Sequence, residues 1–139
     1  MGKTIVEYSG GMAFVGRGAS GHEVRMDAGE SVVGGADAAA RPVETMLSSL
    51  GGCTGMDVVS ILRKMKTEPK SLQIEIQDER ASEYPKVFTK IHLIYRVQGD
   101  VPEDNLIKAI ELSLAKYCPI ANTLNGVSEI TYEYSVGAG

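Results

Sequence analysis

Apolar and polar residues alternate or cluster in three short stretches at the start of the chain, as in β-strands. The stretches are TIVEY (4–8), MAFVG (12–16) and HEVRMD (22–27). We expect Val24 and Met26 to face inward and Arg25 to face outward. Residues 29–40 consist mainly of Gly, Ala and Ser. The opening third of the chain therefore predicts three short strands and a flexible loop.

A long, nearly uncharged segment follows this loop. Pro42 suits a first helical turn, because its missing N–H would have no partner there, and Pro69 ends the segment. Between Glu44 and Arg63 the only charged residue is Asp57. The pattern predicts a helix from Pro42 to about residue 66 that is buried nearly all round. Ser, Thr, Gly and Asp interrupt every long apolar run, so no membrane span is expected.

In the second half of the chain, apolar and polar residues alternate more strictly. Residues 72–77 and 87–97 place apolar side chains at every second position, which predicts an antiparallel sheet with one face in water. His92 falls on that wet face. Further expected elements are a helix from Pro102 to Tyr117 with Leu106, Ile110 and Leu114 inward, a helical turn over 118–124 and a strand over 130–136. This order predicts an α+β fold in a single domain, residues 1–139.

The charge composition of the chain bears on which kinds of partner it can bind. The chain has 139 residues and a net charge of -4, and its 14 Lys and Arg residues are scattered. No basic stripe marks a surface for nucleic acid or anionic lipid. The first residues contain no apolar signal core, so we expect a cytoplasmic protein with reduced cysteines. Two Cys and two His without a close pair make a metal site the weakest use for the thiols.

The two cysteines are the candidate reactive groups. Cys53 lies in the middle of the long helix, where a free cysteine often serves as a small apolar side chain. Gly51 and Gly52 next to it each cost a helix roughly 1 kcal/mol relative to Ala, which indicates that something approaches this backbone closely. Cys118 precedes Pro119. It can therefore cap a helical turn, where N–H groups lower a thiol pKa, or simply join two helices.

A thiolate in an apolar helix needs a compensating cation. Arg17, in the Gly-rich turn VGRGASG, is the candidate, although a solvated loop charge is the alternative. Glu44 lies nine residues before Cys53, about 13 Å along the helix and half a revolution away. Glu44 thus serves the thiol from a second subunit or through a strongly bent helix start, or it is a helix-start carboxylate favoured by the dipole.

Two cysteine motifs, PVETMLSSLGGCTGMDVVSIL (42–62) and KYCPIANTLNG (116–126), resemble the OsmC/Ohr family of osmotically inducible and organic hydroperoxide resistance proteins. The phrase GGCTG followed by DVVSIL is most similar to the less characterised branch of that family. The resemblance covers essentially the whole chain. It implies an OsmC-like fold, with antiparallel sheets around a long buried central helix in an intertwined homodimer.

The resemblance also implies an activity: a thiol peroxidase that reduces organic hydroperoxides in oxidative stress defence and needs no metal, flavin or other cofactor. By this analogy Cys53 is the peroxidatic thiolate and Cys118 resolves its sulfenic acid as a disulfide. A small or protein-bound dithiol of the lipoyl type then reduces that disulfide. Arg17 and Glu44 are the candidates for stabilising the thiolate. The alternative is an OsmC-fold protein that binds an apolar ligand or partner at the dimer interface and only packs its thiols.

Overall fold

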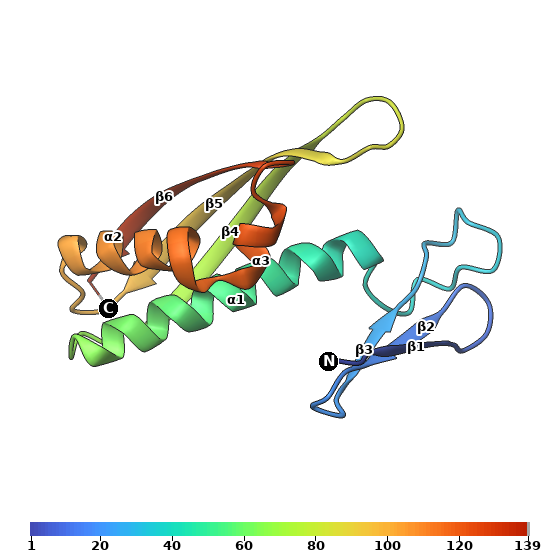
Figure 1. Ribbon diagram of the computed structural model, residues 1–139, viewed down its shortest axis with the longest axis horizontal. Helices are drawn as coiled ribbons and strands as arrows, with labels where there is room; N and C mark the ends of the chain where they lie inside the picture. The colour runs from blue at the N-terminus through green and yellow to red at the C-terminus, as the bar shows by residue number, and fades with distance from the viewer. Residues whose placement is uncertain (139) are drawn as a thin grey trace. The chain divides into compact units, whose positions relative to one another are not determined.

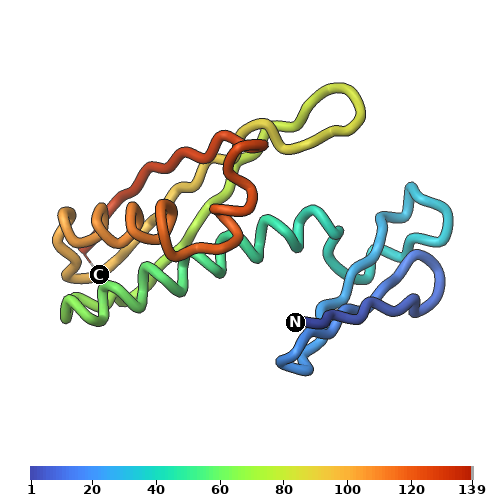
Figure 2. The backbone as a smooth tube through the Cα atoms, in the orientation of Figure 1, coloured from blue at the N-terminus to red at the C-terminus, as the bar shows by residue number. Residues whose placement is uncertain are grey.

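The computed structural model describes residues 1–138 of the chain. Six strands and three α-helices, with one turn of π-helix, give the α+β class that the sequence predicts. The described chain divides into two compact units, which separate after Ser48 (Figure 1). The backbone trace can be followed through each unit in Figure 2.

The first unit contains a small antiparallel sheet. Its strands are β1 (Ile5–Tyr8), β2 (Phe14–Arg17) and β3 (Glu23–Met26), in the order β1-β2-β3. The three expected strands are thereby confirmed. The expected burial of Val24 is wrong, because 45% of this residue is exposed. Strands of four residues present too few side chains to build a core of their own.

A buried carboxylate organises the loop after β3. Asp27 is only 4% exposed and accepts hydrogen bonds from the backbone N–H groups of Ala28 (2.7 Å), Ala36 (3.3 Å) and Ala38 (3.1 Å). These bonds, the one from Ala38 above all, hold the pKa of Asp27 below its usual range. The segment expected to be flexible is therefore tied down at three points by one side chain.

The second unit is built on a mixed sheet of longer strands, β4 (Ser71–Arg80), β5 (Phe88–Gln98) and β6 (Glu129–Gly137). β4 and β5 are antiparallel, as expected. β6 pairs with β5 in parallel, so the expectation of a wholly antiparallel sheet is wrong for this strand. The reason is that the helices between β5 and β6 carry the chain back to the end where β5 begins.

Helix α1 (Pro42–Lys64) is the expected long helix. Its buried residues are Leu50, Thr54, Val58 and Leu62, one stripe at intervals of four. The expectation of burial all round is wrong: Met56 is 76% exposed. In the second unit only one side of the helix packs against the sheet, as Figure 1 shows. By length and composition alone α1 could also cross a membrane, a property that core helices commonly share.

Two glycines let α1 approach β4 closely. A Cβ atom on Gly51 would lie 3.1 Å from Cδ1 of Ile76, and one on Gly55 would lie 3.2 Å from Cδ1 of Ile74. The close approach inferred for Gly51 is confirmed, and the approaching group is the sheet. At Gly52 an added Cβ would meet nothing within 4 Å, so the inference does not hold there.

Three short helical segments complete the second unit: α2 (Glu103–Leu112), the π turn η1 (Ser113–Tyr117) and α3 (Pro119–Leu124). Leu106 and Ile110 are fully buried, as expected. Leu114 is only half-buried, while Ser113 is fully buried. Both the π turn and a polar residue in the core were absent from the sequence-based expectation.

The outer face of the second sheet is polar, as the alternation predicted. His92 on β5 bonds through Nδ1 to the hydroxyl of Thr131 (2.7 Å) and through Nε2 to the carboxylate of Glu133 (2.9 Å). Both partners lie on β6. His92 is therefore part of a surface cross-strand cluster, in agreement with its expected position on the wet face.

The three hydrogen bonds that the Asp27 carboxylate accepts lead to a prediction about the stability of the loop after β3. Asp27→Asn replaces an oxygen that accepts N–H bonds with a donor, so the N–H groups of Ala36 and Ala38 should exchange with deuterium faster. Because the pKa of Asp27 is lowered in the folded protein, the stabilisation is present at neutral pH and is lost as the pH falls below about 4. Asp37→Asn is the matched control, since its ion pair with Arg41 is exposed. Equal protection of Ala36 and Ala38 in wild type and Asp27→Asn would contradict this role.

Candidate functional site

Two thiols 65 positions apart in the sequence meet inside the second unit. Cys53 comes from the middle of α1 and is partly exposed, whereas Cys118 stands directly before α3 and is fully buried. No disulfide joins them, and interaction with Cys53 helps to raise the pKa of Cys118. The structure thus brings the two predicted cysteines together as reduced thiols.

Cys118 occupies the N-cap position of α3, as the Cys-Pro sequence predicted. Its Sγ accepts a hydrogen bond from the N–H of Ala121 at 3.3 Å. The expected lowering of its pKa is wrong in net direction. Burial raises the pKa of Cys118 to about 11, and the bonds from Ala121 and Ile120 only partly oppose it. Desolvation thus outweighs the cap.

The two thiols differ in depth. Cys118 is fully buried and Cys53 is partly exposed. Interaction with Cys53 adds to the burial that raises the pKa of Cys118. Cys53 is therefore the sulfur atom more accessible to a molecule from solvent.

A chain of buried hydroxyl groups lies beside the thiols. The Thr54 hydroxyl bonds to the Tyr95 hydroxyl on β5 (2.8 Å) and to the Ser113 hydroxyl of η1 (2.7 Å), and Ser113 donates to the Asp57 carboxylate (2.9 Å). Thr54, Tyr95 and Ser113 are fully buried. The chain joins helix α1, the sheet and the π turn around one point next to Cys53.

Tyr95 is the member of this chain that lies on the sheet. Burial raises the pKa of Tyr95 to about 12, and the hydrogen bond with Thr54 partly opposes this rise. Negative charge on Cys118 or on Asp57 would raise it further. The alternation over residues 87–97 predicts that Tyr95 faces inward, and no pattern in the sequence singles out Thr54 or Ser113. The available signal was two hydroxyl residues on the inward faces of helices whose other inward residues are apolar.

Arg17 lies at the end of β2 in the first unit. Its guanidinium group pairs with the carboxylate of Glu23 and lies 3.7 Å from that of Glu7. Two neighbouring guanidinium groups, that of Arg17 more than that of Arg25, lower the pKa of Glu23. Arg17 belongs to the first unit and the thiols to the second, so its proposed role at the thiols stays a prediction.

Glu44 lies in the first turn of α1. Its carboxylate accepts a hydrogen bond from the backbone N–H of Arg41 at 3.1 Å. A Glu at this position that reaches back to the residue before the helix is the second half of a capping box. This contact fits the alternative that Glu44 stabilises the helix start, and a role for Glu44 at the thiols stays a prediction.

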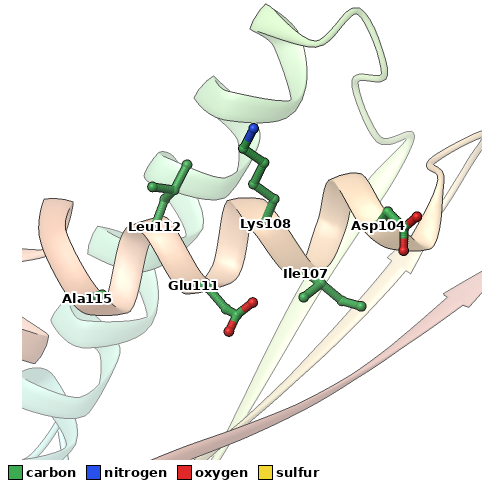
Figure 3. Close-up of a pocket in the computed structure, with 6 residues that line it drawn as sticks. All are labelled: Asp104, Ile107, Lys108, Glu111, Leu112 and Ala115. Carbon is green, nitrogen blue, oxygen red and sulfur yellow. The ribbon is translucent and has the colours of Figure 1, made fainter.

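Other possible sites lie apart from the cysteines. In residues 1–138, no three His, Cys, Asp or Glu side chains form a group that could hold a metal ion. A shallow hollow of about 430 Å³ runs along α2 and into η1 (Figure 3). It is lined by Asp104, Ile107, Lys108, Glu111, Leu112 and Ala115. Neither cysteine contributes to it.

Comparison with known proteins identifies the class to which this fold and thiol pair belong. The family model for OsmC-like proteins matches residues 34–133. The chain belongs to this family, which confirms the resemblance seen in the two cysteine motifs. Protein YhfA of Escherichia coli (strain K12) is 37% identical over 134 residues, 96% of each chain.

Solved structures show the same fold. A protein from Aquifex aeolicus VF5 is 28% identical, with a TM-score of 0.80 over 98% of this chain and 97% of its own. An organic hydroperoxide resistance protein OsmC from Legionella pneumophila has a TM-score of 0.70 over 96% of this chain and 97% of its own, at 15% identity. At that identity the second likeness concerns the fold alone.

The hydroxyl chain makes Thr54 a sensitive position. Thr54→Val keeps the side-chain shape but leaves the buried hydroxyl of Tyr95 without its partner, so we expect the free energy of unfolding in urea to fall by about 1–3 kcal/mol. Thr123→Val, on the exposed side of α3, is the matched control and should change it by less than about 1 kcal/mol. Equal free energies of unfolding for the two variants would show that the Thr54 hydroxyl does not stabilise the contacts between α1, β5 and η1.

Proposed function

We propose that the protein is a cysteine-based peroxidase that reduces organic hydroperoxides to alcohols. The observation that carries the proposal is the pair of interacting free thiols, of which Cys118 is fully buried and Cys53 is partly exposed. Membership of the OsmC-like family supports a redox role. The fold shared with organic hydroperoxide resistance proteins is consistent with it.

The first step takes place at Cys53. Its thiolate attacks the terminal oxygen of the hydroperoxide, so that an S–O bond forms and the O–O bond breaks. The alkoxide leaves with a proton as the alcohol, and Cys53 becomes a sulfenic acid. The sulfur is oxidised by two electrons and the hydroperoxide is reduced by the same two.

The second step uses Cys118. Its sulfur attacks the sulfur of the Cys53 sulfenic acid, forming an S–S bond while the S–O bond breaks. The hydroxide leaves as water and takes the proton of Cys118 with it. Because burial raises the pKa of Cys118 to about 11, this cysteine stays protonated at neutral pH and does not compete with Cys53 for the hydroperoxide.

A dithiol closes the cycle. One of its thiolates attacks the Cys53–Cys118 disulfide, and its second thiol displaces the protein, which regains two thiols while the dithiol becomes a cyclic disulfide. We assign this step to a small or protein-bound dithiol of the lipoyl type. Arg17 and Glu44 are our candidates for stabilising the Cys53 thiolate. Glu44 would act from the second subunit, because in its own helix it lies about half a revolution away from Cys53.

We further propose that the protein is a homodimer. In the first unit, apolar side chains of β1 are half exposed, among them Ile5 (50%) and Val6 (53%). In the second unit, the exposed side of α1 is uncharged around Gly52, Met56 and Ser60. Apolar and uncharged surfaces of this kind support burial against another chain, and a second copy is the simplest partner.

The activity is tested with purified protein, cumene hydroperoxide and dihydrolipoamide. Wild type should consume hydroperoxide, and Cys53→Ser should lose at least about 100-fold, because the attacking thiolate is absent. Cys118→Ser should complete one turnover and then stop as a sulfenic acid, which a sulfenic-acid probe would label. Turnover that survives in Cys53→Ser would refute the mechanism.

The dimer is tested by light scattering after size-exclusion chromatography. Wild type should have twice the mass of the 14.8 kDa chain. Met56→Glu should shift the protein toward the monomer, because it places a charge on the uncharged face of α1. Val127→Glu, at a residue that is 66% exposed outside this face, should leave the mass unchanged. A monomeric wild-type protein would overturn the proposal.

A further inference from the structure

Ser113 is bound to helix α1 through its side chain. Its hydroxyl group donates a hydrogen bond to the Asp57 carboxylate (2.9 Å) and shares a second hydrogen bond with the Thr54 hydroxyl (2.7 Å). Ser113 and Thr54 are fully buried, so the contact between them forms in the protein interior. Thr54 is the residue that follows Cys53 in α1. The first residue of η1 is therefore fixed to the turn of α1 that carries Cys53.

Ser113 is bound to Cys118 through its backbone. The carbonyl oxygen of Ser113 accepts a hydrogen bond from the N–H of Cys118 at 2.8 Å, and this bond closes the π turn η1. π-helices are rare in proteins, and single π turns are frequent at functional sites. One residue thus contacts the segments that carry both thiols, α1 through its hydroxyl group and Cys118 through its carbonyl group.

Asn122 holds the other side of Cys118. Its Nδ2 donates hydrogen bonds to the carbonyl oxygens of Cys118 (2.8 Å) and Leu114 (3.1 Å). Both bonds stay within residues 113–124, so they tie Cys118 to η1 and α3 as one piece. The position of this piece relative to Cys53 depends on what fixes it to α1, and the two side-chain bonds of Ser113 do so.

We infer that Ser113 is a positioning residue for the proposed disulfide: bound to α1 by its hydroxyl group and to Cys118 by its carbonyl group, it holds Cys118 in place relative to Cys53 before the two sulfur atoms join. This role needs no contact between Ser113 and the hydroperoxide. A group that is held in place before it reacts loses less freedom when the new bond forms. The inference deepens the proposed function and rests on it for the existence of the disulfide.

The test measures the stability of the disulfide and uses no hydroperoxide. Protein is equilibrated in buffers with different proportions of reduced and oxidised glutathione, and the fraction with the Cys53–Cys118 disulfide is read from the intact mass after free thiols are blocked. The buffer composition at half oxidation gives the effective concentration of one thiol at the other. In Ser113→Ala the hydroxyl is missing and Cys118 is held less firmly. We expect the effective concentration to fall about tenfold, which raises the reduction potential by about 30 mV.

Ser128→Ala is the matched control. Ser128 is also buried, at 4% exposure, and its hydroxyl donates a hydrogen bond to the carbonyl oxygen of Phe88 at the start of β5 (2.6 Å). Both variants lose one buried hydroxyl group, so a general loss of stability should affect them alike. Ser128→Ala should keep the wild-type effective concentration. A wild-type value in Ser113→Ala, or an equal fall in the two variants, would overturn the inference.

A second variant covers the case in which Ser113→Ala does not fold. Thr54→Val removes one of the two groups on α1 to which Ser113 is bound and leaves the bond to Asp57. We expect a smaller fall in effective concentration, together with faster deuterium exchange of the Cys118 N–H. Wild-type values of both quantities in folded Thr54→Val would refute the positioning role.

The outcome is independent of the peroxidase assay. A selective fall in Ser113→Ala, in a protein that does not consume cumene hydroperoxide, would support the positioning role and contradict the proposed activity. An active wild-type protein whose disulfide is equally stable in Ser113→Ala would contradict the positioning role and support the activity. A wild-type protein that forms no disulfide in oxidised glutathione would overturn both.

Discussion

The thiols of Cys53 and Cys118 interact in the second unit, and this pairing constrains the elements that carry them. Cys53 must stand on the side of α1 that reaches the core, and Cys118 must be delivered from a different part of the chain. The helix approaches the sheet through Gly51 and Gly55, where an added Cβ would crowd the side chains of Ile76 and Ile74. The π turn then sets Cys118 at the start of α3. Each of these features is local, and together they place two thiols in contact.

Burial and hydrogen bonding act in opposite directions at this pair. The hydrogen bonds at the start of α3 favour a thiolate on Cys118. Desolvation raises the pKa of Cys118 by more than these bonds lower it, so the proton stays on the buried sulfur. Because Cys118 stays protonated, Cys53, the more exposed thiol, is the sulfur available to an oxidant. The two thiols therefore differ in their availability to an oxidant because they differ in burial, and not because of the sequence motifs around them. The proposed two-step reaction requires this difference, because one sulfur must be accessible to the oxidant while the other stays protonated until the second step.

Much of this could be predicted from the sequence, because it depends on local patterns. Period-two alternation located the strands, prolines bounded α1, and the Cys-Pro step located the cap. Properties that depend on distant neighbours could not be predicted. The parallel pairing of β6 depends on where the crossover returns, and the partial exposure of α1 depends on how many elements cover it. The polar junction at Thr54 joins residues 41 and 59 positions apart, so no local pattern reports it. Whether Arg17 and Glu44 serve the thiols involves both units and remains a prediction.

The central claim is that the two thiols form one redox unit, and a thiol count tests it most directly. Fully reduced protein is mixed with one equivalent of cumene hydroperoxide in the absence of reductant, and free thiols and intact mass are measured before and after. The account predicts that both thiols disappear together and that the mass falls by two hydrogen atoms, as one disulfide requires. Two thiols that stay free and an unchanged mass would contradict it and would favour a protein that binds its ligand and only packs its cysteines.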